Sequence, residues 1–327
     1  MFYRCKSCGG NVVYDPEKKK MICESCRNEG EHQLVKQEKV HVCNNCGAKI
    51  DAGADALALK CPYCGTYVIF EDRMEREYEP KLILPFSLNK EKAVETLRDN
   101  FKGKLFLPKD FCSVSSVEAM EGIYVPFFMY DMHSHVHFEG EGDKIRVWKE
   151  GDYEVTETRV YHITRDFEVD YDKIPVDASS AMPDNLMDIM EPYRYEDLGD
   201  FTPEYLSGFV ANRYDEDRDS LLPRARHKTE KFDEAYLSET NQLYHAVRKI
   251  NKTVDCREKE SFYAFLPVWK YVYRYREKEY EFYVNGQTGK AVGTPPVSWS
   301  RAALLTFSTG ISVFFCLAML LYFLEVL

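Results

Sequence analysis

The sequence predicts an α+β chain with two small cysteine-rich modules at its N-terminus, a mixed α/β soluble domain and one C-terminal transmembrane helix. Three observations lead to this expectation: eight cysteines in four regularly placed pairs, a middle region in which helical and strand patterns alternate, and a long uncharged stretch near the C-terminus. At 327 residues, 45% of them hydrophobic, the chain is long enough for two or three folded domains.

The eight paired cysteines form a tandem repeat. Adding 38 to the numbers of the first four gives the second four, so C-x2-C-x14-C-x2-C occurs twice. This spacing lets a hairpin close four thiolates around one ion. We therefore expect two zinc ribbons, over residues 1–34 and 35–70, and two structural Zn²⁺ ions. The expected metal ligands are Cys5, Cys8, Cys23, Cys26, Cys43, Cys46, Cys61 and Cys64.

Glycine follows the second cysteine in three of the pairs, at Gly9, Gly47 and Gly65, and permits the tight turn that the site requires. A site closed by four sulfurs leaves no position for water, so its role is structural. Disulfides are one alternative, but a reducing cytosol disfavours them. A redox Cys-x-x-Cys site is another, and the absence of a surrounding βαβ pattern disfavours it.

A charged segment at 71–80 separates the modules from a mixed α/β domain expected over 81–296. Apolar residues recur on one helical face at 89–102, and Gly103 stands where a C-terminal cap belongs. Strand and helix patterns then alternate. The further elements expected are strands at 124–138 and 153–163, a helical region from 185 to about 249, strands at 262–275 and 280–284, a hairpin turn at Asn285-Gly286 and a short strand near 291.

Two stretches of this domain resemble each other weakly. Residues 124–130 and 265–271 share an apolar-Pro-aromatic spacing, and each leads into a strand. An internal duplication would explain the likeness, and so would a proline at the head of an edge strand.

A histidine strand offers a second candidate metal site. His133, His135 and His137 lie on one strand face, near Asp131 and Glu139. We favour the simpler interpretation, a solvated face opposite the apolar side chains of Met132, Val136 and Phe138.

Other patterns in the domain do not indicate catalysis. The stretch 285–290 resembles a phosphate loop, but its two glycines are too close together and Ala291 follows the lysine, so we interpret it as a turn. Cys112 and Cys256 are single thiols among apolar neighbours, which predicts burial. Because neither a catalytic triad nor a carboxylate pair can be recognised, we expect no enzymatic activity.

The charge of the chain argues against nucleic acid as a partner. The net charge is −11, and residues 1–80 hold 12 Lys or Arg against 13 Asp or Glu. The N-terminus has no apolar core of the kind found in a signal peptide, so we expect the bulk of the chain in the cytosol.

The C-terminal stretch 302–324 carries no charge and is long enough to cross a bilayer core of about 30 Å. A buried helix is the alternative, and the lack of a polar face disfavours it. Lys290 and Arg301 precede the stretch, whereas Glu325 follows it. The positive-inside rule therefore predicts a single-pass protein of the cell membrane with its N-terminal bulk in the cytoplasm.

Several short motifs, together with the cysteine repeat, are similar to those of a bacterial family of membrane-anchored tandem zinc-ribbon proteins. These motifs are Leu84-Pro85-Phe86, Val176-Asp177-Ala178-Ser179, Glu191-Pro192-Tyr193, Tyr205-Leu206-Ser207-Gly208-Phe209, Leu266-Pro267-Val268-Trp269 and Asn285-Gly286-Gln287-Thr288-Gly289-Lys290. Members are often labelled primosomal helicase-like or phage replisome organiser, and some are encoded beside a flotillin-like protein and a homologue of phage shock protein A.

The resemblance implies a membrane-anchored scaffold. On this hypothesis the ribbons recruit proteins, among them the flotillin-like protein and the phage shock protein A homologue, to the inner face of the membrane during membrane stress, and the chain forms a hetero-oligomer. The alternative is a membrane-tethered nucleic-acid-binding protein that acts in DNA replication. The chain has no Walker A motif, and no helicase residue can be carried over to it.

Overall fold

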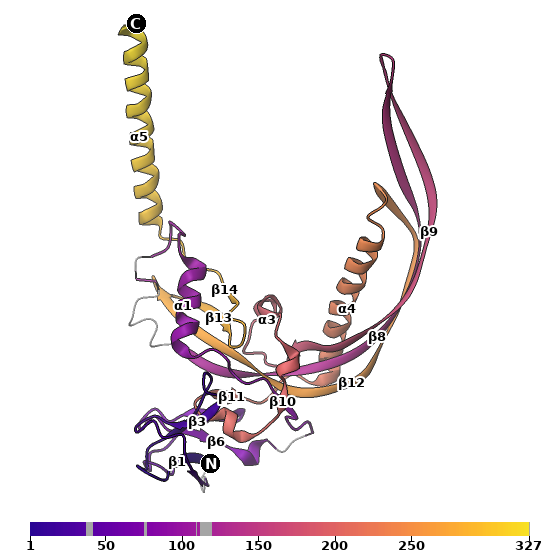
Figure 1. Cartoon of the computed structure of the whole chain (residues 1–327). Coiled ribbons are helices and arrows are strands. Elements are labelled where there is room, and N and C mark those ends of the chain that lie inside the picture. Colours follow the sequence, from indigo (N-terminus) through magenta and orange to yellow (C-terminus); the bar gives the residue numbers. More distant parts are fainter. Residues whose placement is uncertain (37–41, 75–76, 109, 112–119, 327) are drawn as a thin grey trace.

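The computed structural model of the chain describes residues 1–36, 42–74, 77–108, 110–111 and 120–326, with side chains up to residue 320. It confirms the α+β class, with two four-cysteine clusters at the N-terminus and an apolar helix at the C-terminus. Figure 1 shows the cysteine-rich strands at one end of a central body. A long curved ribbon and the C-terminal helix both extend from the body away from that end (Figure 1).

Four strands belong to the first cysteine repeat: β1 (Phe2–Cys5), β2 (Val12–Asp15), β3 (Lys20–Cys23) and β4 (His32–Val35). β1 pairs antiparallel with β4, and β2 pairs antiparallel with β3. The β2–β3 turn is fixed by the Asp15 carboxylate, which accepts hydrogen bonds from the backbone N–H groups of Glu17 and Lys18 at 2.9 and 3.1 Å. The hairpin expected between the two cysteine pairs is therefore present.

The main sheet has ten strands in the described part of the chain. Its path is β10-β7-β12-β8-β11-β5-β6, with β9 beside β8, β13 beside β12 and β14 beside β13. The strands are β5 (Ala56–Lys60), β6 (Tyr67–Ile69), β7 (Leu82–Ile83), β8 (Glu121–Glu150), β9 (Tyr153–Asp177), β10 (Gly199–Asp200), β11 (Val210–Asn212), β12 (Ala246–Tyr275), β13 (Lys278–Asn285) and β14 (Ala291–Gly293). β5 and β6 come from the second cysteine repeat, so this repeat shares a sheet with the following domain.

The helices are α1 (Lys90–Phe101), α3 (Asp184–Met190), α4 (Arg218–Thr240) and α5 (Trp299–Val326), with 3₁₀ turns η1 (Glu71–Arg73), η2 (Tyr195–Asp197) and η3 (Pro203–Leu206). α1 confirms the helix expected at 89–102. The Asn89 side chain accepts from the Lys92 N–H at 2.9 Å and caps its start, and Gly103 follows its end with a φ of +83°.

The long curved ribbon consists of β8, β9 and β12. These strands are longer than their sequence patterns predict. β8 continues to Glu150, β9 to Asp177, and β12 begins at Ala246 instead of 262. The helical region expected from 185 to about 249 was wrong as one element, because α3 and α4 are separated by two 3₁₀ turns and two short strands. Pro192, Pro203 and Gly208 interrupt the helical pattern between them.

One arrangement of elements occurs twice in the body. A short strand, a helix, a long strand and a returning strand follow in this order as β7-α1-β8-β9 and again as β11-α4-β12-β13. β8 and β12 pair antiparallel, with Pro126 opposite Phe265 and Tyr124 opposite Pro267. The short strands are exchanged, since β7 lies parallel to β12 and β11 lies parallel to β8.

This exchange is the pairing expected of two halves related by a local two-fold axis, and it supports the duplication interpretation. The alternative of a proline at the head of an edge strand was wrong. Pro126 lies inside β8, where its neighbour changes from β9 to β11, and Pro267 lies inside β12, where its neighbour changes from β7 to β13. A residue without an N–H suits such a change of partner.

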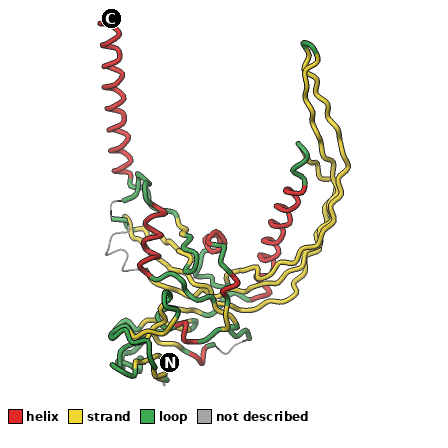
Figure 2. Tube along the Cα trace, in the orientation of Figure 1, coloured by secondary structure: helices red, strands yellow, loops and turns green. Residues whose placement is uncertain are grey.

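α4 lies against the concave side of the ribbon (Figure 2). Asp233, fully buried on α4, accepts hydrogen bonds from the hydroxyl groups of Ser134 in β8 and Tyr171 in β9, at 2.6 and 2.7 Å. One turn further along, Leu237 joins Phe138 and Ile163 in a small apolar cluster. A buried carboxylate thus holds α4 to two strands at once.

Candidate metal centres

Each cysteine pair lies in a short loop held by two backbone hydrogen bonds. In the first pair the Cys5 N–H donates to Gly10 O and the Gly9 N–H donates to Cys5 O, both at 2.9 Å. The pairs at 43–46 and 61–64 repeat this pattern, and the glycine of each loop has a φ between +73° and +75°. The sequence expectation that glycine permits this turn is confirmed.

The pair at 23–26 departs from this rule. Arg27 takes the position that glycine has in the other three loops, with a φ of +58° and an N–H that donates to Cys23 O at 3.0 Å. A left-handed conformation costs a residue with a Cβ about 1 kcal/mol relative to glycine. The hydrogen-bond pattern of the loop therefore stays the same at an energetic cost.

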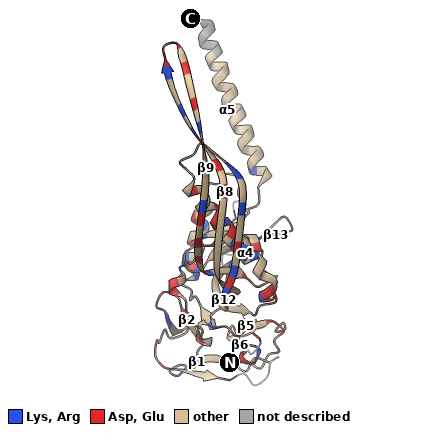
Figure 3. Ribbon diagram, turned by 90° about the vertical axis from the view of Figure 1, so that its right-hand side faces the viewer, with Lys and Arg blue, Asp and Glu red and all other residues tan. Residues whose placement is uncertain are grey.

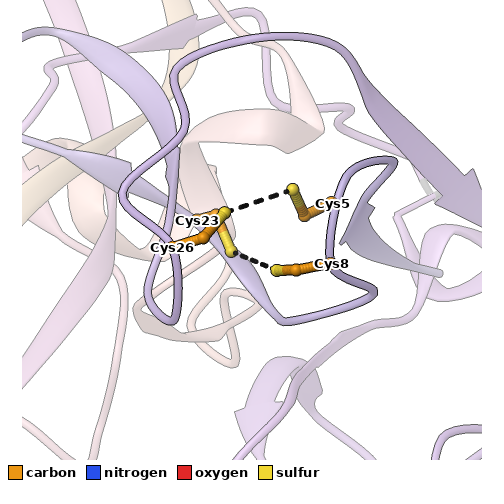
Figure 4. A group of neighbouring side chains, drawn as sticks. All are labelled: Cys5, Cys8, Cys23 and Cys26. Atoms are coloured by element: carbon orange, nitrogen blue, oxygen red, sulfur yellow. Dashed lines mark hydrogen bonds between the residues drawn. The ribbon is translucent and has the colours of Figure 1, made fainter.

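The eight cysteines come together in two groups of four. Within each group all Sγ atoms lie within 4.8 Å of one another. The closest pairs are Cys8 and Cys23 at 3.5 Å, Cys43 and Cys64 at 3.7 Å, and Cys5–Cys26 and Cys46–Cys61 at 3.8 Å. Figure 4 shows the first group, in which four side chains from two loops point toward one centre.

These separations fit a tetrahedral ion. Four sulfurs bound at about 2.3 Å from one centre lie about 3.8 Å apart, close to the shortest distances in both groups. Each group can therefore hold a metal ion with all four positions filled by thiolates.

Hydrogen bonds favour the thiolate form at individual positions. The backbone N–H groups of Cys8 and Ser7 lower the pKa of the Cys5 thiol to about 6. In the second group, burial raises the pKa of Cys64, but hydrogen bonds with Thr66 and with the Asn45 amide outweigh it and lower the pKa to about 6. Burial raises the pKa of Cys43 in the second group to about 12. Only some of the thiols therefore favour the thiolate, which is the metal-binding form of cysteine.

A polar chain joins the two cysteine groups. Asn45, beside Cys46, donates to Thr66 Oγ1 at 2.7 Å, and Thr66 in turn donates to the Asn11 side chain of the first repeat at 2.8 Å. The Arg4 guanidinium also donates to the Asn45 side-chain oxygen. Thr66 is buried, so the two groups form one unit rather than two independent modules.

A second set of contacts attaches the first repeat to the body. The Tyr14 N–H donates to Ser207 O at 2.8 Å, and the Ser207 hydroxyl donates to Val12 O at 2.7 Å. The Tyr14 and Tyr205 rings meet edge to face. Sequence reasoning identified 205–209 as a motif without assigning it a role, and this attachment is its structural role.

Residues from several of the other short motifs that carry the family resemblance meet in the core of the body. Phe86 stacks on Phe209 with ring centroids 4.0 Å apart, and it contacts Trp269 edge to face at 5.1 Å. A Cβ on Gly286 would approach the Phe86 ring to 2.6 Å, so only glycine fits there. The Lys290 ammonium donates to Glu191 O at 2.6 Å. These contacts pack the core of the body.

The remaining candidates follow the simpler interpretations. His133, His135 and His137 lie on the exposed face of β8, opposite the buried Met132, Val136 and Phe138. His133 contacts Asp170, and His135 and His137 share the Asp166 carboxylate, at 2.7 to 2.9 Å. The 285–290 stretch is a turn, in which Asn285 Oδ1 accepts from the N–H groups of residues 287 and 288.

The single thiols differ from expectation in one respect. Cys256 is half-buried and contacts the Thr229 hydroxyl at 3.3 Å, whereas burial was expected. Cys112 lies outside the described residues.

The C-terminal helix α5 is long and apolar enough to cross a membrane. Trp299–Leu320, the part of α5 whose side chains the structure describes, contains an 18-residue stretch with a mean hydropathy of 2.0, and none of that stretch is buried. The base of α5 is attached, since the Ser298 N–H donates to Phe106 O at 2.7 Å and the Arg301 guanidinium donates to Leu107 O.

The fold and the cysteine groups define a protein with two four-thiolate centres on a mixed α/β body that ends in a membrane-length helix. The chain is 35% identical over 312 residues to a Bacillus subtilis (strain 168) protein named "Uncharacterized protein YdjG", and the match covers 92% of each chain. The chain therefore belongs to the YdjG family. No family model matches the chain, and no solved structure does.

Proposed function

We propose that this chain is a membrane-anchored zinc protein that recruits other proteins to the inner face of the cell membrane. The observation that carries the proposal is the position of the cysteine groups. They form the end of the body that points away from α5 (Figure 1). A chain anchored through α5 would present this end to the cytoplasm.

The proposed metal is Zn²⁺, one ion in each four-cysteine group. Four thiolates at tetrahedral separations suit this ion, and the closed geometry gives it a structural role. The ligands are the two groups of cysteines expected from the sequence. Metal analysis of the purified chain should find two zinc ions per molecule, and iron or fewer than two ions would contradict the assignment.

The metal end carries an exposed aromatic side chain suited to protein contact. Tyr63 lies in the cysteine loop between Cys61 and Cys64. Its side chain is 71% exposed, whereas Cys61 is buried. A rigid exposed tyrosine is a frequent anchor in protein interfaces. The proposed partners are a flotillin-like protein and a homologue of phage shock protein A, in a response to membrane stress.

Substitution of the cysteines is a poor test, because Cys5 and Cys23 belong to the main apolar core and their loss would disturb the body. A better variant is Tyr63→Ala in the full chain. Leu105→Ala is a matched control, since Leu105 is 62% exposed but lies beside the base of α5.

The experiment is affinity purification of the full chain, solubilised in detergent from its native membrane, with metal content measured for each variant. We expect both partners with the wild type and with Leu105→Ala, and their loss with Tyr63→Ala at unchanged zinc content. Retention of every partner by Tyr63→Ala would show that this surface does not recruit them. Capture of DNA or replication proteins would favour the alternative, a membrane-tethered nucleic-acid-binding protein.

A further inference from the structure

The ribbon has two long free edges. Its strand order is β9-β8-β12, and β8 is paired on both sides. Among the described residues, β9 pairs with β8 alone along its whole length, and β12 pairs with β8 alone from 246 to 263. α4 covers one face of the ribbon and leaves both edges open (Figure 2). Unpaired backbone groups on such edges can bond to another strand.

The two edges carry opposite charge. β9 holds seven acidic and three basic residues, whereas residues 246–263 of β12 hold five basic and three acidic residues. Figure 3 shows charged residues along both outer strands. Glu168 and Asp172 are exposed on β9 and take part in no described ion pair. Arg257 and Lys259 are exposed on β12, where Arg257 pairs with Asp255 and Lys259 pairs with Asp170 of the same ribbon at 2.6 Å, so each remains open to a further carboxylate. Contact between a β9 edge and a β12 edge would join unlike charges, whereas contact between two β9 edges would join like charges.

Strand direction gives a second argument. β9 and β12 are both antiparallel to β8, so they run in the same direction, from the tip of the ribbon to the body. Copies anchored in one membrane have their α5 helices oriented alike. The β9 of one copy can therefore lie parallel to the β12 of its neighbour without inverting either copy. The body already contains two parallel pairings, β7 with β12 and β11 with β8.

Antiparallel pairing of two β9 edges does not meet this condition. It would turn one copy upside down, and its α5 could not enter the same membrane from the same side.

We propose that neighbouring copies of this chain associate side by side through their ribbons, with the acidic β9 edge of one copy against the basic β12 edge of the next. Such an interface joins different surfaces of identical chains, so it continues from copy to copy and forms a ring when the rotation closes. The occupant of both edges is a second copy of the chain.

The test uses the full chain reconstituted in lipid nanodiscs large enough for several copies. Equal amounts of ¹⁵N-labelled and unlabelled chain are mixed and treated with a carbodiimide, which links a carboxylate directly to a lysine. We expect mixed-isotope peptides that join Glu168 or Asp172 to Lys252 or Lys259. Mixed peptides that join β9 to β9, or their absence, would overturn the proposal.

Charge reversal provides an independent measurement. We expect the mass of the wild-type assembly in detergent to be several times that of one chain. It should fall to a single chain in E168K/D172K and in R257E/K259E, and return when all four changes are combined, since unlike charges then face each other again. E95K on the exposed side of α1 is the control and should assemble as the wild type does.

A wild-type chain that stays a single copy under these conditions would overturn the proposal. It would leave the edges to a strand of a different protein. The proposal would also be overturned if the variant with all four changes failed to assemble while keeping the thermal stability of the wild type. Partner capture through Tyr63 does not enter either readout, so this proposal can fail without the failure of the recruitment proposal.

Discussion

The buried carboxylate between α4 and the ribbon gives the sharpest prediction for stability. Asp233→Ala removes the acceptor of two hydrogen bonds and leaves the hydroxyl of Ser134, which is fully buried, without its partner. A hydrogen bond to a charged group is worth about 1.5–3 kcal/mol. Relief of the desolvation of the carboxylate offsets part of this sum. We expect a net loss of about 3 kcal/mol in the free energy of unfolding.

The measurement is a double-mutant cycle on the full chain in detergent. Asp233→Ala, Ser134→Ala and the double variant are compared by denaturant unfolding, and we expect a coupling free energy of about 1–2 kcal/mol. Hydrogen exchange should accelerate in α4 and remain unchanged in α1, because the lost bonds hold only α4.

The matched control is Glu234→Ala. Glu234 is the next residue of the same helix, and its side chain is exposed and pairs with Lys252. It should change stability little. A loss below about 1 kcal/mol for Asp233→Ala, together with a coupling free energy near zero, would refute the argument that this carboxylate fixes the helix.

Four further predictions concern the loops, the core, a buried charge and the metal. Arg27→Gly should stabilise the fold by about 1 kcal/mol and Gly47→Ala should destabilise it by about as much, measured as paired shifts in melting temperature. Phe86→Ala should cost about 3–5 kcal/mol in urea unfolding, and a cost below 1 kcal/mol would contradict the packing described. Burial raises the pKa of Asp177 to about 6 although Arg224 opposes the shift, so the folded chain holds this proton more tightly than the unfolded chain. Stability from this group falls as pH rises, by about 1 kcal/mol between pH 5 and 7, and Asp177→Asn should remove that slope from the unfolding curve. Removal of metal with a chelator should expose the eight thiols to a thiol reagent and speed hydrogen exchange in β5 and β6; unchanged protection would contradict a structural role for the metal.

The cysteine groups could be predicted from sequence because their ligands are fixed by short spacing. Each loop is local, and two loops separated by one hairpin suffice to close a site. The attachment of the groups to the body was beyond such reasoning. Ser207 meets Val12 and Tyr14 across nearly two hundred residues, and no local pattern reports a contact of that range.

The length of the ribbon strands could not be predicted from the sequence for a different reason. Strands were expected to end near residues 138 and 163, where the alternation of apolar and polar side chains fades. Beyond Phe138 the ribbon is exposed on both faces for most of its length, so alternation has no cause there. The strands continue because β8 and β9 satisfy each other's backbone hydrogen bonds, which any side chain permits.

The ribbon also sets a distance. A strand of 30 residues such as β8 has a contour length of about 100 Å at about 3.3 Å per residue, and most of that length projects beyond the body as a spacer. Beyond Asp143, where β8 pairs with β9 alone, the span is encoded by residue number, because opposed deletions in β8 and β9 there keep every remaining pair in register. Removing an even number of residues from each strand would shorten the spacer without turning any side chain to the other face. Evolution or an experimenter can thus adjust how far the tip stands from the body while the metal centres and the core remain unchanged.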